Sequence, residues 1–162
     1  MKSILIACTA NICRSPMAAT IMRRRIAELG LEDQIEVLSA GVWAEDGHGA
    51  SPNAVITLAE RGMDLTEHRS RLLTPALLAQ AQIVLVMEEA HRRSLFYLAP
   101  QHLGKVYLLT EMSGGHADVA DPYGGPLEGY ARTVDELEAL IDAGMSMILR
   151  RLGIRPKQEP EE

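Results

Sequence analysis

The chain has 162 residues, of which 47% are hydrophobic and 23% are charged, a composition typical of one folded domain. Acidic residues exceed Lys and Arg by 22 to 16, and the net charge of −6 argues against binding to nucleic acid or to an anionic membrane through summed positive charge. Two cysteines are too few for a secreted disulfide framework and are typical of proteins in the reducing cytosol.

The chain begins with a pattern that predicts a strand, a loop and a helix. The run at 3–7 indicates a buried strand. Its five consecutive apolar residues (Ile4 to Cys8) are too few for a secretory signal, and no other apolar run is longer, so we expect a cytoplasmic protein without a membrane segment. Ser15-Pro16 favours a helix start, with Ser15 as the N-cap, and Gly30 favours its end.

The rest of the chain continues this alternation. Ser51-Pro52 and Thr74-Pro75 repeat the helix-start signal. The other expected elements are strands at 35–38, 83–87 and 105–109, helices at 88–98 and 133–152, and a long loop at 110–127. Strands that alternate with helices predict a single three-layer α/β domain at 1–154, a four-stranded parallel sheet with helices on both faces. The polar residues 155–162 are expected to form a C-terminal tail.

The loop after the first strand is the predicted site. It lies where parallel sheets bind ligands, and the start of the following helix makes it an anion cradle. No Gly-Lys-Ser/Thr follows, so it is not a nucleotide-binding loop. Cys8 opens the loop and Arg14 closes it. This positive environment favours a thiolate, and the arginine fork matches two phosphate oxygens. The pattern predicts nucleophilic attack on a bound phosphoryl group.

The two cysteines also have two simpler interpretations. Cys8 could be only a small buried apolar residue, and Cys8 and Cys13 could be metal ligands, which would require two more ligands at short spacing. The five histidines show no such spacing: His48, His68, His91, His102 and His116. We therefore predict no metal and no other cofactor.

Residues 8–18, which read CTANICRSPMA, resemble the phosphate-binding loop of the low-molecular-weight protein tyrosine phosphatases. Ser39-Ala40-Gly41, His68-Arg69-Ser70 and Asp121-Pro122-Tyr123 are similar to further motifs of that family. The order and spacing of these motifs match over about residues 2–152, nearly the whole chain. One departure is Ala10, where the family usually has glycine; if this position needs a positive φ, alanine would carry strain there.

The resemblance implies a role for each matching residue. Cys8 would be the nucleophile that forms a phosphocysteine, Arg14 would hold the phosphoryl oxygens, and Asp121 would be the general acid. Ser15 would donate to the Cys8 sulfur, a role that is compatible with its interpretation as a helix cap. The expected phosphate-binding residues are Thr9, Ala10, Asn11, Ile12, Cys13, Arg14 and Ser15. Asn11 would brace the loop, with His68 and Ser39 as its partners.

Other interpretations of the outer residues stay open. Without the Cys8 loop, Asp121-Pro122-Tyr123 would be read only as a turn. Trp43 and Tyr123 are candidate walls of the substrate pocket, together with Ile12, and Trp43 could equally be a core aromatic. Cys8 and Cys13 could approach closely enough to form a protective disulfide, or Cys13 could only pack under the loop.

The sequence raises four candidate functions. A phosphatase acting on phosphotyrosine in proteins is favoured by Ile12, because an apolar side chain suits a phenyl ring. A protein-arginine phosphatase is the alternative, because 39–43 and 115–125 resemble that bacterial subgroup, although its members tend to have threonine at position 12. An arsenate reductase would need further cysteines after Cys13, and there are none. The joint presence of Cys8, Arg14 and Asp121 argues against a non-catalytic phosphate-binding module.

Overall fold

The structure is a computed structural model that describes residues 1–155. The four strands are β1 (Lys2–Cys8), β2 (Ile35–Gly41), β3 (Ile83–Val86) and β4 (Val106–Leu108). The helices are α1 (Arg14–Glu28), α2 (Pro52–Glu60), α3 (Pro75–Gln80), α4 (Glu89–Leu98) and α5 (Leu127–Leu152), with 3₁₀ segments η1 (Pro100–Lys105) and η2 (Leu109–Ser113). All strand pairs are parallel, in the order β2-β1-β3-β4, which confirms the predicted fold class.

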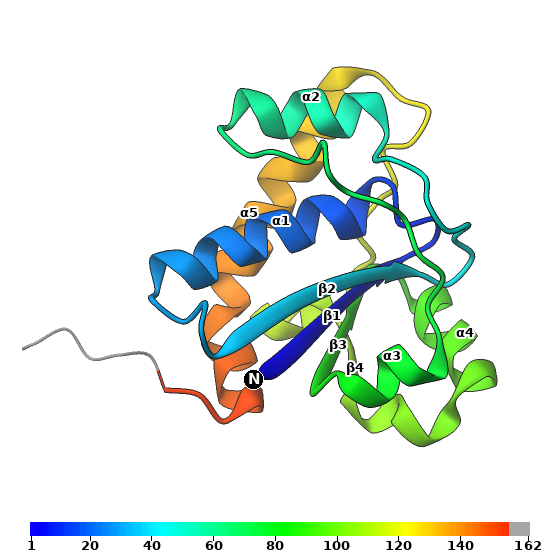
Figure 1. Cartoon of the computed structure of the whole chain (residues 1–162), viewed down its shortest axis with the longest axis vertical. Coiled ribbons are helices and arrows are strands. Elements are labelled where there is room, and N and C mark those ends of the chain that lie inside the picture. Colours follow the sequence, from blue (N-terminus) through cyan, green and yellow to red (C-terminus); the bar gives the residue numbers. More distant parts are fainter. Residues whose placement is uncertain (156–162) are drawn as a thin grey trace, which may run out of the picture.

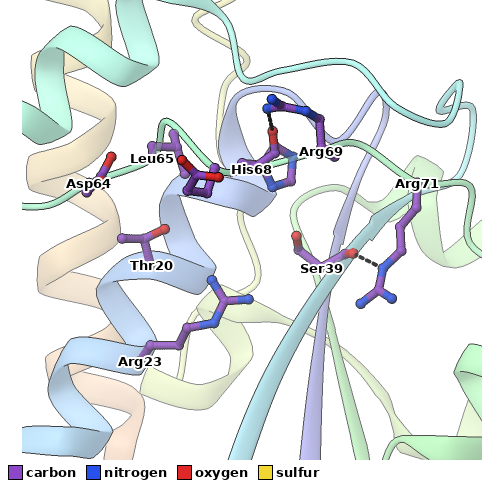
Figure 2. A pocket seen from close by; sticks show the side chains of 9 residues that line it. Thr20, Arg23, Ser39, Asp64, Leu65, His68, Arg69 and Arg71 are labelled. Carbon is purple, nitrogen blue, oxygen red and sulfur yellow. Dashed lines mark hydrogen bonds between the residues drawn. The ribbon is translucent and has the colours of Figure 1, made fainter.

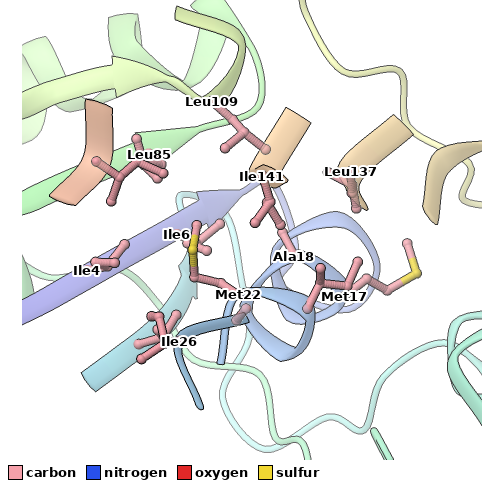
Figure 3. Packing of buried hydrophobic residues seen from close by; sticks show 14 of the residues in the cluster. Ile4, Ile6, Met17, Ala18, Met22, Ile26, Leu85, Leu109, Leu137 and Ile141 are labelled. Atoms are coloured by element: carbon pink, nitrogen blue, oxygen red, sulfur yellow. The ribbon is translucent and has the colours of Figure 1, made fainter. Parts of the chain in front are cut away.

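Helices cover both faces of the sheet, with α1, α2 and α5 on one side and α3 and α4 on the other (Figure 1). Side chains of β1 alternate between the two layers, as expected for a strand buried on both faces. Ile4 and Ile6 pack into the core under α1 and α5, whereas Leu5 and Ala7 face the core under α3 and α4. Figure 3 shows the first of these cores, where α1 and α5 meet β1.

The boundaries differ from the sequence prediction at two helices. The last helix starts at Leu127 rather than at Thr133, because Tyr130, only 2% exposed, anchors the additional first turn in the core. The first helix starts at Arg14, with Cys13 at the N-cap position and no side-chain cap bond, so the N-cap role predicted for Ser15 is wrong. The loop expected at 110–127 begins within η2. Most of the expected tail, 156–162, lies outside the described residues.

The sheet order creates a crevice at the carboxyl end of β1. From β1 the chain passes to β2 on one side, whereas β3 pairs with β1 on its other side. In parallel sheets, ligands bind where the strand order reverses in this way, so the loop from Cys8 to Arg14 lies at such a point. None of the helices within residues 1–155 is sufficiently long and apolar to cross a membrane.

Candidate active site

The loop between β1 and α1 surrounds a cavity of about 280 Å³. Cys8 is the last residue of β1, and Arg14 is the first residue of α1. The cavity is lined by Cys8, Thr9, Ala10, Ile12, Cys13, Arg14, Asp121 and Tyr123. The structure therefore brings the predicted nucleophile, phosphate-binding arginine and acid around one space, although Asp121 is more than a hundred residues away in the chain.

Asn11, rather than Ala10, supplies the left-handed turn of the loop. Its φ is 58°, and it is the one non-glycine residue with a positive φ in the described part of the chain. Asparagine tolerates this conformation better than most residues, so the strain considered for Ala10 does not arise. Gly41 lies against the same turn, where a Cβ atom would come within 2.5 Å of the Thr9 carbonyl oxygen. The Ser39-Ala40-Gly41 segment therefore needs glycine at its last position.

Hydrogen bonds hold the fully buried side chain of Asn11 in place. Its amide Nδ2 donates to Ser15 Oγ at 2.8 Å and to Ser39 Oγ at 3.0 Å, and its Oδ1 accepts from the backbone N–H of Arg71 at 3.1 Å. His68 Nε2 donates to the Asn11 carbonyl oxygen at 2.6 Å. Because all these partners lie outside the cavity, Asn11 links the loop to the surrounding fold rather than to a ligand.

A second hollow of about 370 Å³ lies behind this brace and is lined by His68, Ser39, Arg71 and Arg23, among others (Figure 2). Arg71 Nε donates to the Ser39 carbonyl oxygen at 2.9 Å. Burial and the neighbouring Arg23, Arg69 and Arg71 lower the pKa of His68, against the effect of its hydrogen bond to the Asn11 carbonyl. A neutral His68 with its proton on Nε2 makes the bond to Asn11, so the brace needs no charge on the imidazole.

Ser15 lies between Asn11 and the cysteine sulfur. Its Oγ accepts the bond from Asn11, is 2.9 Å from Cys8 Sγ and is 3.4 Å from the Ala40 carbonyl oxygen. Since the hydroxyl accepts from the amide, its own proton is free to point toward the nearer sulfur. The arrangement suits the expected role of Ser15 as a donor to Cys8.

Arg14 is only 2% exposed, and three acceptors hold its guanidinium. Its Nη1 donates to Glu88 Oε1 at 2.9 Å and to the Val119 carbonyl oxygen at 2.7 Å, and its Nη2 donates to Thr9 Oγ1 at 3.3 Å. A buried charge is costly without a partner, and Glu88 supplies the opposite charge. Because both protons of Nη1 and one proton of Nη2 go to protein acceptors, Nε and the second proton of Nη2 are left as the edge that can face an oxyanion.

Asp121 and Tyr123 come from the segment before α5 and close the cavity from the opposite side. The Asp121 side chain is 44% exposed, and its Oδ2 lies 3.6 Å from Arg14 Nη2. Its Oδ1 accepts from the backbone N–H of Tyr123 at 3.1 Å, which fixes the carboxylate near the cavity. The Tyr123 side chain is exposed, so it forms part of the rim.

Trp43 lies beside the cavity rather than in it. Its side chain is 77% exposed, which excludes the interpretation as a core aromatic. It lines an adjacent hollow of about 420 Å³ that also contains Ile12 and Tyr123. Trp43 therefore borders the cavity without lining it.

The second cysteine has its own buried partners. Cys13 Sγ lies 3.1 Å from Ser51 Oγ and 3.4 Å from Tyr130 Oη. Burial raises the pKa of the Cys13 thiol, and burial together with Cys13 raises the pKa of Tyr130 to about 12. Both Cys8 and Cys13 are free thiols, so a disulfide between them stays a prediction. No cluster of three or more His, Cys, Asp or Glu side chains that could hold a metal occurs within residues 1–155.

Sequence reasoning missed Glu88 and His91. His91 is 2% exposed and lies 2.9 Å from Thr9 Oγ1 through its Nε2. Both residues follow β3, and β3 pairs directly with β1. Their position after a strand end was visible in the sequence, but the strand order that places them beside the loop was not.

Comparisons with known proteins agree with this geometry. A family model described as low molecular weight phosphotyrosine protein phosphatase matches residues 3–152. A probable low molecular weight protein-tyrosine-phosphatase, EpsP, of Ralstonia nicotianae is 36% identical over 94% of this chain and 99% of its own length. A protein-arginine-phosphatase of Geobacillus stearothermophilus is 40% identical over 86% of this chain and 90% of its own.

A solved structure extends the similarity to three dimensions. It is a mutant of the YwlE arginine phosphatase with a phosphorylated active-site serine in place of cysteine, and it superposes with a TM-score of 0.85 at 36% identity. The alignment covers 91% of this chain and 95% of that chain. With the family model and the two relatives, it leads to one conclusion: the chain belongs to the low molecular weight phosphotyrosine protein phosphatase family.

Proposed function

We propose that this protein is a cysteine-dependent phosphatase that hydrolyses phosphotyrosine in a phosphorylated protein substrate, in the reducing cytosol and without a cofactor. The observation that carries the proposal is the cavity in which Cys8, Arg14 and Asp121 meet at the N-terminus of α1. The positive end of a helix and a buried guanidinium together stabilise an oxyanion. The side chains needed for phosphoryl transfer therefore lie around one anion site.

The first chemical step is attack of the Cys8 sulfur on phosphorus. The S–P bond forms as the P–O bond to the substrate breaks, and the free edge of the Arg14 guanidinium holds two of the remaining oxygens. Asp121 donates a proton to the leaving oxygen, which avoids release of a high-energy phenolate. In the related enzyme named above, the serine that replaces the active-site cysteine carries a phosphoryl group, which supports a covalent intermediate at the equivalent position here.

The second step releases phosphate. Water attacks the phosphocysteine, the Asp121 carboxylate takes a proton from that water, and the S–P bond breaks. The departing sulfur becomes a thiolate, which the hydroxyl of Ser15, 2.9 Å from Cys8 Sγ, stabilises by donating a hydrogen bond. The cycle returns Cys8 and Asp121 to their starting protonation states.

The role of Asp121 can be tested through the leaving group. Asp121→Asn should lower kcat/KM for phosphotyrosine by about 10²-fold, within the usual effect of a positioned general acid. It should lower kcat/KM much less for an aryl phosphate with a very acidic phenol, because that leaving group needs no proton. Asp118→Asn is a matched control, because Asp118 accepts from the backbone N–H of Glu89 and does not line the cavity. An equal loss for both substrates would assign Asp121 a structural role instead.

The preference for tyrosine rests on Ile12. It lines the cavity and also the neighbouring hollow that contains Trp43 and Tyr123. An apolar side chain that shares a hollow with two aromatic residues suits the flat phenyl ring of phosphotyrosine. A guanidinium at the same place would leave N–H donors against an apolar surface, which costs free energy.

A protein-arginine phosphatase is the second candidate. The relative from Geobacillus stearothermophilus carries that name at 40% identity. Here the Asp121 carboxylate is 44% exposed beside the cavity, where it could also pair with a substrate guanidinium. Both candidates use the same loop chemistry and differ in the group that leaves.

A comparison of two substrates separates these candidates. We expect the wild type to have the higher kcat/KM for phosphotyrosine, and Ile12→Thr to shift the ratio about 10-fold toward phosphoarginine, the size of one added polar contact. Val55→Thr provides a control on α2, away from the cavity. A wild type that prefers phosphoarginine would establish the second candidate.

A further inference from the structure

His91 is a buried histidine that the proposed mechanism does not use. It lies in the first turn of α4 and is 2% exposed. Its Nδ1 is 3.1 Å from the backbone nitrogen of Glu88, which can only donate a hydrogen bond. Its Nε2 is 2.9 Å from Thr9 Oγ1 in the phosphate-binding loop. The imidazole therefore spans the space between the start of α4 and the loop.

These contacts determine which nitrogen carries the proton. Since Nδ1 accepts from the Glu88 N–H, it is unprotonated, and a neutral imidazole must then carry its proton on Nε2. His91 thus donates to Thr9 Oγ1. Burial and the nearby Arg14 lower the pKa of His91 to about 4, against the opposing effects of Glu88, Asp118 and Asp121. The imidazole is therefore neutral, with this proton arrangement, near neutral pH.

The hydroxyl of Thr9 accepts two hydrogen bonds. One comes from His91 Nε2 and the other from Arg14 Nη2, at 3.3 Å. A hydroxyl has two acceptor lone pairs and one proton, so both lone pairs are used and the proton must point away from both donors. Thr9 also lines the cavity beside Cys8. The one hydrogen of this hydroxyl is therefore available to an oxyanion in the cavity.

We infer that His91 is a positioning residue that orients the Thr9 hydroxyl as an additional hydrogen-bond donor to a bound phosphoryl oxygen. The inference rests on the proposed function, since it assigns a donor to the same site. The chain of donors runs from the Glu88 N–H through the imidazole to Thr9, and hydrogen bonds in such a chain strengthen one another. Glu88 supports the site through two groups: its backbone N–H donates to His91 Nδ1, and its carboxylate accepts from Arg14 Nη1 at 2.9 Å.

Four variants test the inference by calorimetric titration with inorganic phosphate, which does not require hydrolysis. Thr9→Val keeps the shape of the side chain and removes the hydroxyl, and should weaken phosphate binding about 10-fold, as expected for one hydrogen bond to a charged group. Thr9→Ser keeps the hydroxyl and should restore most of the affinity. His91→Phe fills the ring volume without a donor and should weaken binding, whereas His91→Gln retains an N–H and should weaken it less.

The double variant Thr9→Val/His91→Phe separates positioning from a general structural effect. If His91 acts through Thr9, the double variant should bind phosphate no more weakly than Thr9→Val alone. Thr57→Val is the control for the same substitution at a buried position outside the cavity, because Thr57 lies on α2 and donates to the Asn53 carbonyl oxygen. In nitrogen NMR of the wild type, the His91 Nε2–H signal should shift when phosphate is added, and this shift should disappear in Thr9→Val.

The inference is overturned if Thr9→Val binds phosphate as tightly as the wild type, if the two substitutions add, or if the wild type does not bind phosphate. If His91→Phe misfolds, the inference can still be contradicted, because Thr9→Val and the NMR shift test the same donor without altering α4. Phosphate binding that depends on Thr9 in a protein without hydrolytic activity would contradict the proposed function and leave this inference standing. Hydrolytic activity in a protein whose phosphate binding does not depend on Thr9 would contradict this inference and leave the proposed function standing.

Discussion

Cys8→Ser should lower the turnover of phosphotyrosine by at least about 10⁴-fold, because the reaction loses its nucleophile. A serine hydroxyl stays protonated near neutral pH, and no base in the described part of the site is bonded to this position; its one side-chain partner is the hydroxyl of Ser15. An alkoxide is also a much poorer leaving group than a thiolate. A phosphoserine trapped at position 8 is therefore compatible with this prediction, since turnover still stops.

The measurement is steady-state hydrolysis of an aryl phosphate, with protein mass recorded after incubation with substrate. Cys13→Ser is the matched control, because Cys13 is the other thiol that lines the cavity but its sulfur contacts Ser51 and Tyr130. Its activity should fall much less than that of Cys8→Ser. The proposed mechanism is wrong if Cys8→Ser keeps most of the activity, or if Cys13→Ser is the variant that loses it.

Arg14→Lys should lower kcat/KM by about 10²- to 10³-fold, although the charge is kept. Lysine offers a single point of donation, whereas Arg14 binds Glu88 and the Val119 carbonyl with one nitrogen and leaves another edge for the oxyanion. An ammonium attracted to Glu88 would turn away from the cavity. The loss should therefore include weaker binding of inorganic phosphate as well as slower turnover.

Arg24→Lys on the same helix is the control for this substitution. Arg24 is exposed and donates to the Arg61 carbonyl oxygen, away from the cavity, so phosphate binding and kcat/KM should both stay within about 2-fold of the wild type, because exchanges at exposed surface positions have small effects. If Arg14→Lys retained wild-type phosphate affinity, the guanidinium fork would not be the oxyanion ligand. Thermal unfolding of each variant separates loss of the site from loss of the fold.

Local sequence determined the elements that carry the site. The apolar run before Cys8 forms β1, and the loop from Thr9 to Cys13 leads directly into α1. Such features depend on neighbouring residues, because hydrophobic periodicity and turn chemistry act over a few positions. The alternation of strands and helices likewise predicted the parallel sheet. The family resemblance predicted which distant residues brace the loop. The structure brings two of them, Ser39 and His68, to Asn11.

Tertiary structure decided what local signals could not. Ser15 has the side chain of a helix cap, but it contacts Cys8 in the site, and helix α1 begins at Arg14, two residues before the Pro16 start that an N-cap at Ser15 predicts. Helix α5 gains its first turn because Tyr130 is buried against the core, a contact that no local propensity contains.

The surroundings of Arg14 illustrate why local sequence could not predict these contacts. Glu88 is 74 residues away from Arg14, and Thr9 is 82 residues away from His91, and they meet because β3 lies directly beside β1 in the sheet. Strand order depends on how whole layers pack, so the sequence by itself determined the loop and its nucleophile. Only the packed sheet determined that Glu88 and His91 contact the loop.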